Sequence, residues 1–77
     1  MEYIDVIAQF DPAGAIHPLF VRIDEMRLRV DRVTDIRPAA SLKQGGIGLR
    51  YTCLIQGKKV WLYLDDNKWF WEPVDLY

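Results

Sequence analysis

The sequence contains only one cysteine, Cys53, and one histidine, His17. A single cysteine excludes an intramolecular disulfide and any cysteine-based metal cluster. It also suits a reducing compartment, so we expect a cytoplasmic protein. No cofactor or metal is expected, because even the adjacent acids Asp65 and Asp66 lack the further oxygen ligands that calcium or magnesium requires.

Long apolar runs are also missing. No stretch approaches the roughly 20 apolar residues of a membrane span, and the start of the chain lacks the basic and apolar regions of a secretory signal. We therefore expect no membrane partner. The net charge of −1 likewise provides no general attraction to nucleic acid or to a lipid surface.

Catalytic signatures are absent as well. A catalytic histidine needs a nucleophile and an orienting carboxylate, and no local spacing supplies them to His17. Cys53 falls on the apolar side of a predicted strand, which favours a small buried hydrophobe over a nucleophile. Residues 45–48, Gly-Gly-Ile-Gly, lead into a strand rather than a helix, so they indicate a flexible loop rather than a phosphate cradle. The sequence predicts no enzyme.

What the chain does have is the composition of one globular domain. Of its 77 residues, 51% are hydrophobic and 27% are charged, the balance of a folded rather than a disordered protein. This length is enough for one core and no more. We expect residues 1–77 to form a single β domain.

Apolar and polar residues alternate along most of the chain, and a period of two is typical of strands. Residues 16–23 and 27–31 show it clearly, with Phe20 and Arg22 expected to point outward and Leu19 inward. The alternation slips near Asp31, where we expect a β-bulge that returns the following Val33 to the core. The predicted strands cover residues 3–10, 16–23, 27–33, 49–55, 60–65 and 68–71. A helix over residues 24–36 is the alternative for that part, and residues 38–48 are predicted to be the longest loop, with one helical turn over residues 39–43.

The C-terminal stretch, residues 60–71, holds all three tryptophans. Asp66 and Asn67 tolerate positive φ, so they suit the loop of a two-residue hairpin. That loop pairs Leu62 with Trp71 and Leu64 with Trp69 on a wholly apolar face, which should be the core side. A second hairpin is predicted around residues 57–58, joining the strand over residues 49–55 to the one that follows.

Six strands, short turns and one bulge predict an all-β fold. The architecture that suits them is a small antiparallel five- to six-stranded sheet forming a partly open barrel or roll. Periodicity alone does not distinguish an SH3-like from an OB-like arrangement.

The reverse side of the C-terminal hairpin carries three aromatic residues, Trp61, Tyr63 and Phe70, which we call the hairpin face. Three bases are expected at its margins: Arg50, Lys58 and Lys59. Aromatic rings beside cations are the residue types that bind single-stranded nucleic acid, and peptide grooves in small barrels use them too. The other interpretations are that the N-terminal strand or the C-terminal tail covers this face, or that it is buried in a homodimer.

Two stretches of the sequence, with the aromatic hairpin, resemble a family pattern. The stretches are Pro18-Leu19-Phe20-Val21-Arg22-Ile23 and Arg27-Leu28-Arg29-Val30-Asp31-Arg32-Val33. The pattern is that of small uncharacterised bacterial all-β domains, some encoded beside translesion DNA polymerases. This chain has Glu25 where the pattern has a turn glycine. The resemblance contains no catalytic motif and implies a non-enzymatic accessory domain near DNA repair.

These observations together favour a non-enzymatic binding module. It would hold an extended partner, single-stranded nucleic acid or peptide, on the hairpin face. The alternative is a structural homodimer in which two hairpin faces bury each other.

Overall fold

The computed structural model describes residues 2–41 and 45–74, and the regular structure of these residues is entirely β-strand. The strands are β1 (Glu2–Tyr3), β2 (Asp5–Phe10), β3 (Ile16–Ile23), β4 (Met26–Arg29), β5 (Arg32–Ser41), β6 (Gly45–Ile55), β7 (Lys58–Asp65) and β8 (Lys68–Pro73). The prediction of an all-β fold is confirmed, and the alternative of a helix over residues 24–36 is wrong. Over these described ranges, no helix is present that could cross a membrane.

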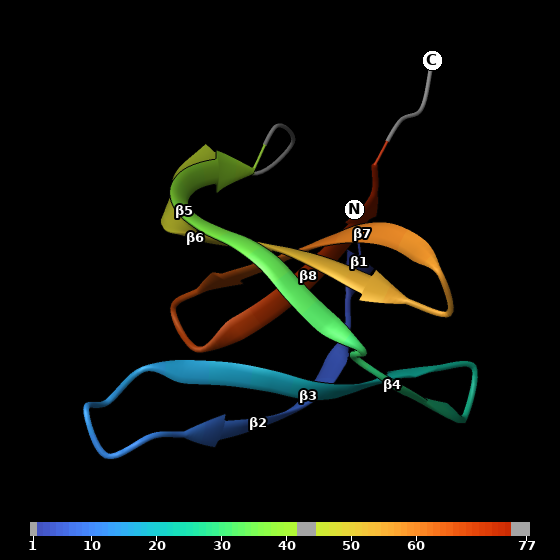
Figure 1. Ribbon diagram of the computed structural model, residues 1–77. Coiled ribbons are helices and arrows are strands. Elements are labelled where there is room, and N and C mark those ends of the chain that lie inside the picture. The colour runs from blue at the N-terminus through green and yellow to red at the C-terminus, as the bar shows by residue number, and fades with distance from the viewer. Residues whose placement is uncertain (1, 42–44, 75–77) are drawn as a thin grey trace.

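The strands form two antiparallel sheets. The larger has the order β1-β8-β7-β6-β5 and the smaller the order β2-β3-β4. Figure 1 shows the small sheet lying across the bottom of the view and the large, strongly curved sheet above it. The sheets are not closed into a barrel, because the ladder of paired strands is interrupted between them.

The chain passes between the sheets at two corners, which is why six predicted strands appear as eight. The first corner is at Ile4, whose N–H donates to the carbonyl of Trp69 at 3.0 Å. The second is at Val30 and Asp31, whose N–H groups donate to the carbonyls of Leu19 at 2.8 Å and Leu54 at 2.9 Å. The second corner lies where the bulge was predicted.

The C-terminal hairpin has the predicted register. Asp65 pairs with Lys68, Leu64 with Trp69 and Leu62 with Trp71. Asp66 and Asn67 form the turn, and both have positive φ, 52° and 61°. Side chains therefore alternate as expected, and the strand phase on which the hairpin face depends is confirmed.

The β6–β7 hairpin differs from the prediction by one turn position. The turn residues are Gln56 and Gly57, both with positive φ, so Lys58 belongs to β7 and pairs with Ile55. Cys53 consequently pairs with Val60, whereas a turn at residues 57–58 would have paired it with Leu62. A register shift of two residues preserves the faces, because side chains alternate with a period of two.

The long loop predicted over residues 38–48 is wrong. β5 continues through Pro38 to Ser41 and β6 starts at Gly45, so the Gly-rich stretch is strand; the predicted helical turn lies partly outside the described residues. Pro38 is compatible with β5 because β5 is an edge strand with one unpaired side. Gly48 has a packing role, since a Cβ built there would lie 2.5 Å from the carbonyl oxygen of Leu64.

The core lies between the two sheets. Its buried residues are Val21, Val30, Tyr51, Cys53, Ile55 and Leu62. Tyr51 joins the sheets, because its hydroxyl donates to the carbonyl of Ile16 in β3 at 2.8 Å while its ring lies 5.3 Å from that of Trp69. Val33 packs against this core, as expected.

Leu19 does not point inward as predicted. The pairing of β2 with β3 shifts between Ile7 and Ala8, so that Ile7 faces Phe20 and Ala8 faces Pro18, with Leu19 skipped. Pro18 is buried in its place and Leu19 is 37% exposed. The extra residue on β3 reverses the alternation at this point.

Candidate binding site

The hairpin face of Trp61, Tyr63 and Phe70 lies on β7 and β8, and its neighbours come from β6 and β1. Cross-strand pairing places Arg50 beside Tyr63, Tyr63 beside Phe70 and Phe70 beside Tyr3. The Arg50 guanidinium lies 4.7 Å from the centre of the Trp61 ring, within the range of a cation–π contact. The structure thus brings three predicted aromatic residues and one predicted base together.

Two of these rings are not accessible. Tyr63 is only 3% exposed and Phe70 only 4%, while Trp61 is half-buried beside Arg50. Burial raises the pKa of the Tyr63 hydroxyl, the charge of Glu72 raises it further, and a hydrogen bond with Arg50 acts in the opposite direction. Stacking on Tyr63 or Phe70 therefore requires this face to be uncovered first.

The predicted basic margin is divided between the two sides of the large sheet. Lys59 pairs with Leu54 and shares the side of Trp61, whereas Lys58 pairs with Ile55 on the core side. Both lysines are exposed. Arg50 is partly buried, and its Nε has no hydrogen-bond partner in the described structure. Lys58 therefore does not belong to the hairpin face.

A second aromatic and basic surface lies on the outer side of the small sheet. Its members are Ile7, Phe20, Arg22, Arg27 and Arg29, which we call the arginine face. Cross-strand pairing sets Ile7, Phe20 and Arg29 in one row, and Arg22 beside Arg27 in the next. Because paired residues point to the same side of a sheet, all five share this face.

The arginine face is more open than the hairpin face. Its three arginines are exposed, Ile7 is 50% exposed and the Phe20 ring is half-buried. The Arg27 guanidinium lies 5.0 Å from the centre of the Phe20 ring. In the described part of the chain, no ion pair joins the three arginines to a carboxylate. By the same pairing, Asp5 lies opposite Arg22 on this side of the sheet, so one carboxylate accompanies the three cations.

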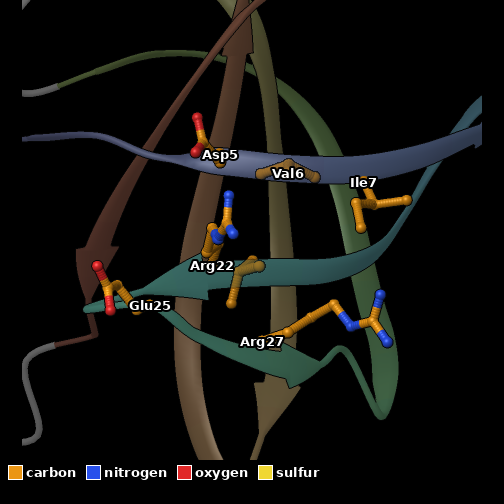
Figure 2. Close-up of a pocket in the computed structure, with 7 residues that line it drawn as sticks. Asp5, Val6, Ile7, Arg22, Glu25 and Arg27 are labelled. Carbon is orange, nitrogen blue, oxygen red and sulfur yellow. The ribbon is translucent and has the colours of Figure 1, made fainter.

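A shallow hollow of about 370 Å³ lies against this face. It is lined by Asp5, Ile7, Arg22, Glu25 and Arg27, together with Val6 and Val21. Figure 2 shows Arg22 pointing toward the strand that carries Asp5, while Arg27 extends in the direction away from Glu25. Asp5 and Glu25 thus lie toward the turn end of the hollow, and the Arg27 guanidinium lies at its other end.

The sequence predicted that Phe20 and Arg22 point outward, but not their assembly with Ile7, Arg27 and Arg29. Arg22 and Arg27 are five residues apart and become neighbours only through the tight turn at Asp24 and Glu25. Both turn residues have positive φ, 49° and 65°, although neither is glycine. Recognising this turn as a two-residue hairpin would have placed the arginines side by side.

His17 has a carboxylate partner, contrary to expectation. Its Nε2 lies 2.9 Å from Oδ2 of Asp11, while Oδ1 of Asp11 accepts the N–H groups of Ala13 and Ala15. Two hydrogen bonds lower the pKa of the Asp11 carboxyl. The larger effect comes from His17 and the next from the backbone N–H of Ala15. These contacts fix the β2–β3 loop. Within residues 2–41 and 45–74, no group of three acidic, cysteine or histidine side chains is placed to hold a metal ion.

Comparisons of the chain with protein-family models, with curated proteins and with solved structures find no significant match. The function is therefore inferred from the geometry of the two faces.

Proposed function

We propose that this protein is a non-enzymatic binding module that holds an extended partner on an aromatic and basic sheet face, with single-stranded nucleic acid as the first candidate and peptide as the second. The main support is the arginine face, where the Arg27 guanidinium lies beside the Phe20 ring and two more exposed arginines adjoin it. A base can stack on such a ring while neighbouring cations contact the phosphates.

The arginine face is a better candidate than the hairpin face. Stacking requires a ring that a base can reach, and Tyr63 and Phe70 are buried. The hairpin face remains the second candidate surface, through Trp61, Arg50 and Lys59. A homodimer formed through the hairpin face has less support, because one chain already buries these two rings.

The proposal also covers the finer architecture of the two sheets and the cellular compartment of the protein. We take the two sheets as a partly open barrel or roll, SH3-like or OB-like, because the corners at Ile4 and at Val30 connect the edges of both sheets. OB-folds bind oligonucleotides on the face of their second and third strands. If β1 and β2 are counted as one strand bent at Ile4, β3 is the second strand and β4 begins the third. A bacterial, cytoplasmic protein agrees with the family resemblance and with the free thiol.

A titration of labelled single-stranded oligonucleotide at several salt concentrations tests the function. About three phosphate contacts predict a slope near −2 for log affinity against log salt, so a fourfold rise in salt should weaken binding by roughly twentyfold. Arg22→Gln and Arg27→Gln should each reduce the slope by about 0.7. Lys59→Gln, on the hairpin face, is the matched control and should leave the slope unchanged.

The outcomes separate the alternatives. Absence of oligonucleotide binding at low salt would remove the nucleic-acid version, and binding of extended acidic peptides under the same conditions would then favour the peptide version. A slope that responds to Lys59→Gln and not to the two arginine variants would move the site to the hairpin face.

A further inference from the structure

A small apolar pocket opens at one end of the core, separate from both faces. It lies between the β3–β4 turn and the β6–β7 turn, which occupy the same end of the molecule in Figure 1. Its volume is about 130 Å³. Both sheets line it: Ile23 and Leu28 belong to the small sheet, and Ile55, Val60 and Trp71 belong to the large one. We call this the end pocket.

The lining of the end pocket is almost wholly apolar. Its polar lining residues are Gln56 and Lys58, of which Lys58 alone is charged. The backbone N–H of Gln56 already donates to Asp31 at 3.2 Å. The acids of the neighbouring turn, Asp24 and Glu25, do not line the pocket. A ligand would therefore meet aliphatic side chains and an indole inside, and an ammonium group beside them.

The size of the end pocket limits its occupant. An apolar cavity of about 150 Å³ holds one benzene molecule, and apolar cavities of this kind stay free of water. A volume of about 130 Å³ that is open to solvent therefore admits a single ring or a branched aliphatic group whose substituent extends outward. Lys58 favours a negatively charged substituent, because its alternation with Lys59 places it on the pocket side of β7.

We propose that the end pocket binds a small aromatic carboxylate, with the ring against Trp71 and Leu28 and the carboxylate at the Lys58 ammonium. This site is independent of the proposed function, because it shares no residue with either the arginine face or the hairpin face. The pocket lies where ligands commonly enter small β folds, at the mouth between their sheets.

Phenylacetate is the probe for the first experiment. Its addition should change the fluorescence of Trp71 and shift the amide resonances of Ile23 and Ile55 in NMR spectra, with saturation in about the millimolar range expected of so small a ligand. Benzyl alcohol, which has the ring but no charge, should bind two- to fivefold more weakly, as expected for loss of an exposed ion pair. No saturable change at about 10 mM phenylacetate would overturn the proposal.

Three variants locate the site. Lys58→Gln should weaken phenylacetate binding two- to fivefold and leave benzyl alcohol unaffected, whereas Lys59→Gln, its neighbour on the opposite side of β7, should change neither. Leu28→Phe should fill the pocket and abolish binding of both probes, and circular dichroism checks that this variant stays folded. Equal binding by wild type and a folded Leu28→Phe, or equal effects of the two lysine variants, would overturn the proposal.

Discussion

Tyr51 is the residue that connects the two sheets. Its ring is in the core beside Trp69, and its hydroxyl donates to the carbonyl of Ile16 at 2.8 Å. A buried hydrogen bond of this kind contributes about 1 kcal/mol, and its loss also leaves the carbonyl without that donor. The hydroxyl therefore stabilises the packing of one sheet on the other.

Tyr51→Phe should lower the free energy of unfolding by about 1 to 2 kcal/mol while preserving the fold. Urea denaturation measures this difference. Tyr3→Phe is the control, because Tyr3 is exposed on the edge strand β1, and it should change stability by less than about 0.5 kcal/mol. Equal effects of the two variants would show that the hydroxyl of Tyr51 does not join the sheets.

Cys53 makes stability depend on alkaline pH. Burial raises the pKa of its thiol from 9.0 to about 12. The folded chain therefore keeps a proton that the unfolded chain has lost, and stability falls as pH rises from about 9 to about 12. Cys53→Ala should be less stable at neutral pH but should show a shallower decline above pH 9, measured by urea unfolding at several pH values. If the slope of stability against pH were the same in both proteins, the assignment to Cys53 would be contradicted. Burial also raises the pKa of Tyr51, so some decline in stability should persist in Cys53→Ala.

At the scale of elements, turns determine which side chains become neighbours. The β3–β4 turn places both Asp24 and Glu25 at positive φ, a conformation that costs residues with a Cβ about 1 to 2 kcal/mol. This turn makes Arg22 and Arg27 a cross-strand pair, so the arginine face depends on it.

Glu25→Gly should raise the free energy of unfolding by up to about 1 kcal/mol, because glycine relieves the strain at φ 65° more than it increases the entropy of the unfolded chain. Glu25→Ala removes the same charge and keeps the strain, so it should give no such gain. Thermal unfolding of the three proteins makes the comparison. A gain shared by both variants would point to the charge of Glu25 instead of the backbone.

At the scale of the whole molecule, burial of the hairpin face within one chain bears on the alternative of a homodimer. Tyr63 and Phe70 are almost inaccessible, so little apolar area of this face remains for a second copy. The exposed aromatic ring beside it is Tyr3, which is 60% exposed. A stable dimer interface usually buries about 800 Å² on each partner.

We therefore expect wild type and Trp61→Lys to sediment alike, as monomers, in analytical ultracentrifugation. Circular dichroism checks that the variant keeps its fold. A wild-type dimer that Trp61→Lys dissociates would instead support the structural alternative and place the contact on the hairpin face.

Much of the fold could be predicted wherever turn chemistry and alternation agreed. Asp66 and Asn67 specify a tight turn and both arms alternate, so the register of β7 and β8 was predicted pair by pair. Between β6 and β7 the faces were right although the turn was one residue off. Leu19 was predicted wrongly, because a bulge depends on the partner strand, and no pattern in β3 alone reveals it. The strand residues 38–41 and 45–48 were missed. Pro38 is tolerated there because β5 is an edge strand, and Gly48 is required by a close backbone contact.

The candidate site shows the same division. Alternation along each strand established that Phe20 and Arg22 point outward, and likewise Trp61 and Phe70. Whether a ring on such a face meets solvent depends on what packs over it, and that is decided by the curvature of the sheet and by distant segments. The hairpin face is therefore largely closed and the arginine face open, although the sequence favoured the first.

The sequence by itself determined the all-β class, the phase of the hairpins and the burial of Cys53, because a period of two and the conformational preferences of turn residues act over a few neighbouring positions. Only the tertiary structure decided how the chain crosses between sheets at Ile4 and Val30, which arginines become neighbours, and where a pocket remains at the end of the core. Those features arise from contacts between residues far apart in the chain, whose energies depend on the packing of both partners at once.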